Sequence, residues 1–455
     1  MTKILIFIDW FLPGYKAGGP ISSNANLIDH LSDKFEFYVV TRDTDYCESV
    51  PYKNINADTW NKLPNGANVY YISAKKLGFS KLVKVCKSIE FDIVYVNGIY
   101  SPYFSLFPLV YFKYFTRKKV IISSRGMLSD HTFSAKKGKK KLFYGFARIV
   151  GLYKGITFHA TNEDEALQIR KNVGFSGTIK VAPNMPPKSE NTFDRTITKR
   201  PGELKLISVA RISPEKNTLF ALKILEKLRS VHRRQTTDDR VEKVDRDQKE
   251  EERKVEIEVE ENQTNLEPGT WNLVFDLYGT IYSTSYWEEC QQVIKHLPSN
   301  IKVRYCGTLE KEKITATLGN YHFLFMPSQG ENYGHSIVES FLAGCPVIIS
   351  DRTPWRNLDT VQSSRFKVQN SKNQVKVEAK DERNKPELGN LNLDLSLCTG
   401  WDIPLDDPDK FVEIINKCLE MDQEEYLEIS RNAFNYGQSI TNDSEVMKEN
   451  EQIFD

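Results

Sequence analysis

The sequence lacks the features of a disulfide-rich, zinc-binding or membrane-spanning protein. Its seven cysteines include no CxxC pair and several lie in apolar runs, which is typical of reduced thiols in a cytosolic protein. Its cysteines and histidines show no zinc spacing. No stretch approaches the roughly 20 apolar residues of a membrane span, and the run Ile4–Ile8 is too short for a signal-peptide core. We therefore expect a cytoplasmic protein, or one in peripheral contact with a membrane.

An acidic cluster near the C-terminus does not supply a metal site either. Asp406 and Asp407 stand before Pro408, and an apolar helical pattern follows. Because proline is favoured in the first turn of a helix, this order predicts that Asp407 is a helix N-cap. We expect no metal ion.

The chain also has no large excess of one charge, although its two parts differ. The net charge is +1, from 62 basic and 61 acidic residues. Residues 1–200 hold 30 basic and 16 acidic residues (+14), and the remainder holds 32 basic and 45 acidic residues (−13). A basic first part predicts contact with something anionic, such as a membrane surface or a phosphorylated ligand, but solvated surface charge is the alternative. We expect no nucleic-acid partner.

Short apolar runs punctuate the first part of the chain. Runs without polar alternation predict strands that are buried on both faces of a parallel sheet. They are Ile4–Ile8, Phe35–Thr41, Val69–Ile72, Ile93–Asn97, Val120–Ser123, Gly155–Ala160 and Thr178–Val181. Helical stretches such as Ile21–Leu31 fall between some of them. This alternation predicts a doubly wound α/β sheet that binds ligands at the carboxyl ends of its strands.

The same pattern starts again after a polar linker that ends at Pro201. The predicted strands are Leu204–Ala210, Leu273–Tyr278, Val303–Cys306, His322–Met326 and Pro346–Ser350, and the predicted helices are Leu219–Leu228 and Tyr286–His296. A chain of 455 residues suits two domains, which we place at residues 1–197 and 198–425. Polar tracts at about 232–265 and 368–392 have few apolar side chains to bury, and we interpret them as surface insertions.

The most informative motif is G-E-N-Y-G-H-S-I-V-E at residues 330–339, between a predicted strand and a predicted helix. Glu331 and Glu339 bracket the start of that helix. The free N–H groups and the positive end of the helix dipole suit a diphosphate or sugar oxygens, and Gly334 lets the backbone approach a ligand closely. The alternative is that both carboxylates only complement the helix N-terminus.

This motif resembles the E-x7-E signature of the retaining GT-B glycosyltransferases, in particular the family 4 group. The resemblance implies two Rossmann-like domains that face each other across a cleft, with a C-terminal helix over 426–455 that crosses back to the first domain. In that family the first Glu binds hydroxyls of the donor sugar and the second binds the ribose, which implies these roles for Glu331 and Glu339. Three further residues of the motif are then expected to bind the donor: Asn332, Tyr333 and Gly334.

A cationic loop follows the first strand of the second domain. Arg211 and Lys216 lie between that strand and a helix that begins near Thr218. Fixed cations stabilise the negative charge that builds on a departing nucleoside diphosphate. The resemblance implies this task for both residues, so we expect them to act in catalysis with Glu331, and the Arg211 guanidinium to point into the crevice that holds Glu331. An ordinary solvated charge is the alternative for either residue alone.

Two segments of the first domain fit the opposite wall of such a site. P-G-Y-K-A-G-G-P at residues 13–20 is not a GxGxxG fingerprint, but Gly18 and Gly19 precede a predicted helix, and in the family a glycine-rich loop here lies beside the donor. After the strand at 120–123, many relatives carry a His near the reacting sugar. This chain has Arg125 there and His131 six residues later, and we expect these two on the acceptor side.

The resemblance implies transfer of a sugar from a nucleoside-diphosphate sugar to a hydroxyl acceptor, a glycan or a lipid-linked saccharide, in polysaccharide biosynthesis. The resemblance implies retention of the anomeric configuration and independence of metals, with no cofactor besides the donor. A lysine run at 136–141 suits contact with an anionic membrane, or a plain solvent-exposed helix start. A nucleotide-sugar epimerase of the same fold and a non-catalytic nucleotide-sugar-binding scaffold are the alternatives.

Overall fold

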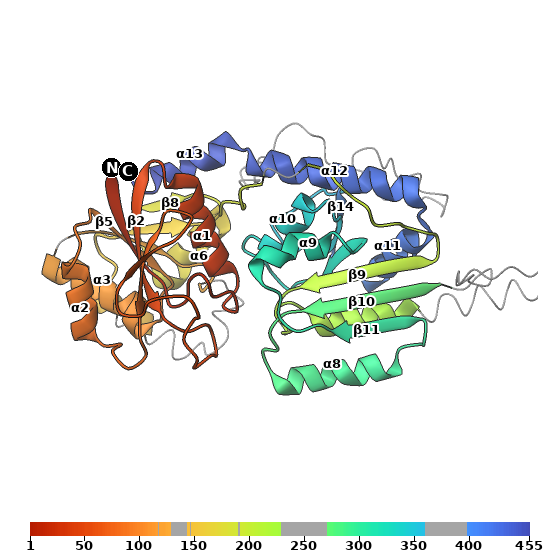
Figure 1. Cartoon of the computed structure of the whole chain (residues 1–455), viewed down its shortest axis with the longest axis horizontal. Coiled ribbons are helices and arrows are strands. Elements are labelled where there is room, and N and C mark those ends of the chain that lie inside the picture. The colour runs from red at the N-terminus through yellow and green to blue at the C-terminus, as the bar shows by residue number, and fades with distance from the viewer. Residues whose placement is uncertain (117, 129–142, 146, 190–191, 229–270, 360–397) are drawn as a thin grey trace, which may run out of the picture.

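The computed structural model describes residues 1–116, 118–128, 143–145, 147–189, 192–228, 271–359 and 398–455. Within these ranges the chain forms two α/β halves that lie side by side, each built on one sheet (Figure 1). His131, the lysine run at 136–141 and the two polar tracts at about 232–265 and 368–392 lie outside the described residues.

The first half is an eight-stranded sheet in the order β3-β4-β2-β1-β5-β6-β7-β8. All neighbouring pairs are parallel except β3 with β4. The strands are β1 (Thr2–Phe7), β2 (Phe35–Arg42), β3 (Trp60–Lys62), β4 (Asn68–Ile72), β5 (Ile93–Asn97), β6 (Lys119–Ser123), β7 (Thr157–Ala160) and β8 (Ile179–Val181). Every residue of β5 is buried, as expected for an apolar strand with both faces covered.

Helical segments connect these strands. They are α1 (Gly19–Leu31), α2 (Phe79–Lys87), the run η1 (Pro102–Leu106), α3 (Phe107–Tyr111) and η2 (Phe112–Thr116), and α6 (Glu163–Gln168) with η3 (Ile169–Val173). The side chains of β1 alternate between the two faces of the sheet, so Leu5 and Phe7 join one apolar core and Ile4 and Ile6 join the other.

The second half is a six-stranded sheet in the order β11-β10-β9-β12-β13-β14, with every neighbouring pair parallel. The strands are β9 (Glu203–Val209), β10 (Asn272–Tyr278), β11 (Ile301–Tyr305), β12 (Phe323–Met326), β13 (Val347–Ser350) and β14 (Gly400–Ile403). The helices are residues 218–228, α8 (Thr284–His296), η4 (Lys311–Lys313), α9 (Ile314–Leu318), α10 (His335–Leu342) and α11 (Pro408–Glu420). The strand order reverses between β9 and β12, which makes the carboxyl ends of these two strands the expected ligand position.

Two helices, α12 (Gln423–Thr441) and α13 (Ser444–Gln452), end the chain and return it to the first half (Figure 1). Tyr436 of α12 packs its ring 5.0 Å from that of Phe341 in α10. Beyond α13, Phe454 is buried in the core of the first half, 5.2 Å from the ring of Phe35. The single C-terminal helix that the sequence predicts is thus interrupted, because Asp443 caps a new helix by accepting from the N–H groups of its first turn.

The predicted strands are all present, with ends that differ by at most two residues. The sequence did not predict β3, a polar edge strand, or β14, which is short and follows a long polar tract. Asp407 caps α11 as predicted, because its side chain accepts a hydrogen bond from the Lys410 N–H. The described helices include none with both the length and the apolar character needed to cross a bilayer.

Candidate active site

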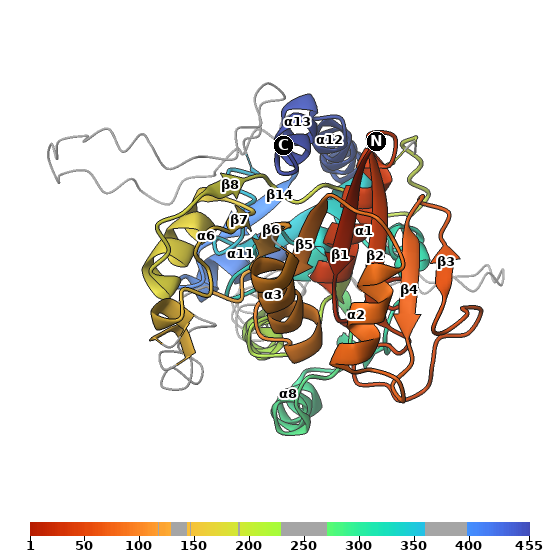
Figure 2. The ribbon, with the colours of Figure 1, turned by 90° about the vertical axis from the view of Figure 1, so that its left-hand side faces the viewer.

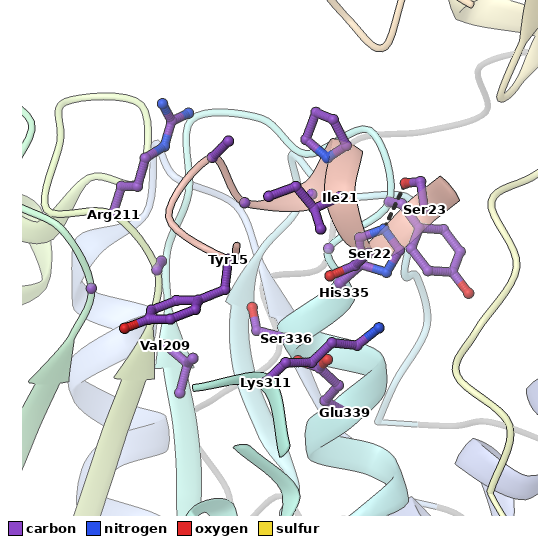
Figure 3. Close-up of a pocket in the computed structure, with 18 of the residues that line it drawn as sticks. Tyr15, Ile21, Ser22, Ser23, Val209, Arg211, Lys311, His335, Ser336 and Glu339 are labelled. Carbon is purple, nitrogen blue, oxygen red and sulfur yellow. Dashed lines mark hydrogen bonds between the residues drawn. The ribbon is translucent and has the colours of Figure 1, made fainter. Parts of the chain in front are cut away.

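A pocket of about 280 Å³ lies between the two halves (Figure 3). Its walls come from the loops that follow β1, β6, β7 and β8 in the first half and β9, β10, β11 and β12 in the second. Each of these loops leaves the carboxyl end of its strand. The pocket therefore occupies the position where doubly wound sheets bind their ligands.

Two loops of the second half are joined at the point where its strand order reverses. Gln329, after β12, donates its backbone N–H to the carbonyl of Glu215, after β9, at 2.8 Å. The side chain of Asn217 donates to the carbonyl of Pro327 at 3.0 Å. These bonds fix the cationic loop against the acidic turn, although the two are more than 100 residues apart in sequence.

Lys216 and Glu331 form an ion pair in this part of the pocket. The ammonium of Lys216 contacts Oε1 of Glu331, and the hydroxyl of Ser328 donates to the same oxygen at 2.9 Å. The Lys216 and Glu331 side chains are only 20% and 8% exposed. Two of the three residues predicted to be catalytic therefore meet directly, and the lysine orients the carboxylate.

Arg211 lines the same pocket, but its guanidinium does not face the interior. It lies over the ring of Tyr282, 6.0 Å from the ring centroid. In Figure 3 it points away from His335 and Glu339. The sequence predicts a guanidinium that points into the crevice that holds Glu331, and the structure does not show this. In this conformation the side chain lies instead at the edge of the pocket, and only a change of rotamer would bring it to a ligand.

Two helices, one from each half, begin at the pocket. Gly334 precedes α10 with φ 78°, and Gly18 precedes α1 with φ 76°, a left-handed region that favours glycine. Neither helix start has a side-chain cap. Their first-turn N–H groups and the positive ends of both dipoles are therefore directed at one pocket, which is a suitable setting for an anion.

Glu339 is buried and Lys311 is half-buried beside the start of α10. Desolvation raises the pKa of the Glu339 carboxyl to about 7, and the positive charge of Lys311 partly opposes that shift. Burial lowers the pKa of Lys311, whose ammonium donates to Oδ1 of Asn26 in α1 at 3.2 Å. No motif in the sequence marks Lys311. It enters the site because the loop after β11 carries it there.

His335, in the lining of the pocket, joins the two halves. Its Nε2 is 2.8 Å from the hydroxyl of Ser23 in α1 (Figure 3). Desolvation, together with the positive charges of Lys311 and Arg125, lowers its pKa to about 3, so the ring is neutral near pH 7. Its Nδ1 is buried without a hydrogen-bond partner among the described residues, as is the hydroxyl of Tyr333.

Arg125 is held in a network of neutral groups on the opposite wall. Its guanidinium donates to Oδ1 of Asn184 and, at 3.0 Å, to the hydroxyl of Tyr95. That hydroxyl is 2.7 Å from Nδ1 of His159, which is buried and whose pKa desolvation lowers to about 4. Arg125 takes part in no ion pair within the described ranges. Its φ of 50°, unusual for a residue with a side chain, shows that the backbone is constrained there.

A buried carboxylate shapes the loop that carries Arg125. Glu165 accepts from the Gly126 N–H at 2.7 Å, and from both the N–H and the hydroxyl of Thr161 at 2.8 and 2.7 Å. Gly126 has φ 73°, and a Cβ there would collide with the side chain of Asn332. The loop after β6 is thus pressed against the acidic turn of the other half.

Comparison with solved structures identifies the architecture. The chain is similar to Anabaena HepE in complex with UDP-glucose (TM-score 0.58, 15% identity, 100% of this chain and 98% of that one). It is also similar to sucrose-phosphate synthase from Thermosynechococcus elongatus (TM-score 0.60, 12% identity, 100% and 98%) and to WaaG, a glycosyltransferase involved in lipopolysaccharide biosynthesis (TM-score 0.55, 10% identity, 99% and 98%). No family model and no curated protein matches the sequence.

The fold is GT-B. At these identities the likeness establishes the architecture, and the positions of the side chains come from the structure itself. The pocket is lined by every predicted site residue that the structure describes: Gly18, Gly19, Arg125, Lys216, Glu331, Asn332, Tyr333, Gly334 and Glu339, with Arg211 at its edge. It adds residues that the sequence did not predict: Ser23, Thr161, Asn184, Lys311 and His335.

Proposed function

We propose that this GT-B chain is a retaining, metal-independent glycosyltransferase. It moves a sugar from a nucleoside-diphosphate sugar to a hydroxyl of a glycan or lipid-linked saccharide. The observation that carries this proposal is the Lys216–Glu331 ion pair in a pocket that also holds the buried carboxylate of Glu339. The similarity to HepE, whose structure contains UDP-glucose, supports the donor class.

The donor would bind along the wall formed by the second half. Glu339 would accept hydrogen bonds from the ribose hydroxyls, and the uncapped start of α10 would receive the diphosphate. Lys216 and a rotated Arg211 would stabilise the charge that develops on the leaving diphosphate. Glu331 and Asn332 would hold the hydroxyls of the sugar.

The acceptor would approach from the wall formed by the first half, where Gly19 and Arg125 face the pocket. In a front-face reaction the sugar–phosphate bond breaks and the sugar–acceptor bond forms on the same face of the ring. The departing phosphate oxygen takes the proton of the acceptor hydroxyl. Contacts between the halves, such as Ser23 with His335 and Lys311 with Asn26, would keep the pocket closed and limit hydrolysis of the donor.

We further propose that the protein works in the cytoplasm in polysaccharide biosynthesis, with its basic first part in contact with an anionic membrane. The +14 charge of residues 1–200 supports this placement.

The test is a screen of radiolabelled nucleotide sugars for binding and donor hydrolysis, with Glu331→Ala and the isosteric Glu331→Gln beside the parent chain. We expect one donor class to bind, and both variants to lose turnover by about 100-fold or more. The proposal fails if no nucleotide sugar binds or if Glu331→Ala transfers at the parent rate. With donor alone, an epimerised sugar nucleotide would favour the isomerase alternative, and tight binding without turnover the scaffold alternative.

A further inference from the structure

Large apolar side chains are exposed together on the first half, over α2, the η1–α3–η2 run and residues 148–154. Phe115 is 76% exposed, Ile149 86% and Phe79 56%. Val110, Tyr114 and Val150 are also exposed. These six residues form what we call the outer apolar surface. Figure 2 shows α2 and α3 at the end of the molecule that is turned away from the second half.

Ring contacts connect Phe79 with Phe115, and a hydrogen bond connects Tyr114 with Val150. A row of rings starts at Phe79 and passes to Phe107 at 5.8 Å, to Tyr111 at 5.4 Å and to Phe115 at 6.1 Å. The hydroxyl of Tyr114 donates to the carbonyl of Val150 at 3.1 Å, which ties residues 148–154 to η2. Monomeric proteins scatter single apolar residues over their surfaces, whereas a connected patch of aromatic rings marks an interaction site.

The segments that carry the outer apolar surface hold more basic than acidic residues. The described residues of 79–119 and 143–154 include two acidic residues, Glu90 and Asp92, and eight basic ones: Lys81, Lys84, Lys87, Lys113, Lys118, Lys119, Arg148 and Lys154. The ammonium of Lys113 donates to the carbonyl of Leu152 at 2.9 Å and lies 5.0 Å from the ring centroid of Tyr114. A second copy of this chain would bring like charges together, so the charge disfavours self-association through this face and favours an anionic partner.

We propose that the outer apolar surface, together with basic residues of the same segments, docks on the interface of an anionic lipid bilayer. Exposed Phe, Ile and Val side chains would enter the acyl boundary, Tyr side chains would sit at the level of the headgroups, and the cations would contact lipid phosphates. This proposal gives the membrane contact a defined surface. It does not depend on sugar transfer, since it rests on residues outside the pocket.

The position of this surface bears on the pocket. Because it lies on the end of the first half away from the second half (Figures 1 and 2), docking would immobilise the acceptor-side half alone. The second half would stay free to open and close over a donor.

Vesicle flotation with the full chain tests the proposal. We compare vesicles of phosphatidylcholine with vesicles that also contain phosphatidylglycerol, at low and high salt. The Phe115→Ser/Ile149→Ser double variant removes apolar area, and Lys84→Glu/Lys87→Glu reverses charge. Leu167→Ser is the matched control, since Leu167 is 59% exposed but lies on α6 beside Glu163 and Asp164.

The parent chain should float with the anionic vesicles and lose binding as salt rises. Phe115→Ser/Ile149→Ser should weaken binding by at least about tenfold, since burying one large apolar side chain is worth about that factor. Lys84→Glu/Lys87→Glu should also weaken binding by at least about tenfold, since each basic residue near an anionic surface is worth about 1 kcal/mol. Leu167→Ser should bind like the parent. Equal binding of parent and Phe115→Ser/Ile149→Ser would overturn the proposal. A parent that ignores vesicles but forms dimers that the same variant dissociates would overturn it in favour of a protein interface. Nucleotide-sugar binding, measured on each variant in parallel, should be unchanged and so separates this outcome from failure of the proposed function.

Discussion

The two walls of the pocket differ in how their charges are arranged. The second half contributes Lys216 paired with Glu331, and Lys311 beside the buried Glu339. The first half contributes glycine turns, hydroxyl and amide groups, and Arg125, whose hydrogen-bond partners are neutral. Before any ligand binds, the second half thus holds both of its interior cations beside carboxylates, with Arg211 at the edge over Tyr282, whereas the first half pairs Lys16 with Glu48 and leaves Arg125 among neutral groups. We infer that the second half holds the reacting donor, and that the first half selects the acceptor and encloses the pocket.

The largest effect should come from removing the paired cation of the second half, Lys216. Lys216→Ala should lower kcat/KM by about 100- to 1000-fold, because it removes charge stabilisation of the leaving diphosphate and leaves the buried Glu331 unpaired. Initial rates with saturating acceptor measure the loss. Lys223→Ala, at an exposed position of the helix over 218–228, is the matched control and should behave like the parent. A Lys216→Ala variant within about fivefold of the parent would remove the donor wall from the mechanism.

A second prediction uses the ionisation of Glu339. Its pKa is raised from 4.5 to about 7 in the folded protein, so the folded state holds this proton more tightly than the unfolded state does. The contribution to stability is full below about pH 4.5 and is lost as pH rises through about 7. The charge of Lys311 limits the shift. Burial raises the pKa of the Tyr333 hydroxyl, and the charge of Glu339 adds to that rise.

The isosteric Glu339→Gln variant has no proton to lose. At pH 8 it should be more stable than the parent by about 3 kcal/mol, and at pH 4 the two should agree. Urea unfolding at several pH values measures the difference. The affinity for a nucleotide sugar should depend on pH in the opposite sense to the stability. The parent should bind a nucleotide sugar more tightly above pH 7, where the carboxylate accepts the ribose hydroxyls, and Glu339→Gln should bind it weakly at every pH. A parent whose affinity does not change between pH 6 and pH 8 would contradict the ribose role.

A third prediction concerns Arg125, the first-half cation whose hydrogen-bond partners are neutral. Arg125→Ala should raise the KM for the acceptor by about ten- to a hundredfold, the worth of hydrogen bonds from a charged group. Donor binding should change by less than about twofold. Arg125→Lys keeps the charge but loses the planar guanidinium, so its KM for the acceptor should lie between those of the parent and Arg125→Ala. If Arg125→Ala weakens donor binding as strongly as Lys216→Ala does, the division of labour between the walls is wrong.

The contrast between the walls also explains what the sequence could predict. Lys216 and Glu331 follow strands at fixed spacings, so a local pattern identifies both, and the bonds from Gln329 to Glu215 and from Asn217 to Pro327 convert that pattern into a shared site. The strands were predictable for the same reason, since a buried parallel strand is a continuous apolar run.

The residues that the sequence did not predict reach the pocket through tertiary packing. Asn184 lies in a proline-rich stretch that gives no functional signal, and it reaches Arg125 only because the loops after β6 and β8 end at the same edge of the sheet. Lys311 and His335 gain their roles from contact with α1 of the other half. For Arg211 the sequence pattern predicts the correct loop but does not determine the rotamer of the side chain.

The smallest effect should come from the hydrogen bond that joins the walls, between Ser23 and His335. One neutral hydrogen bond is worth about 1 kcal/mol, so Ser23→Ala should lower transfer by only about fivefold. Because this bond helps to close the pocket over the donor, hydrolysis should fall less than transfer, and the ratio of hydrolysis to transfer should rise. Combining Ser23→Ala with His335→Ala should cost about 1 kcal/mol less than the sum of the two single changes, since either change alone already breaks the bond. Strictly additive effects would mean that Ser23 and His335 act separately, and that closure depends on other contacts, such as Lys311 with Asn26 and the packing of Gly126 on Asn332.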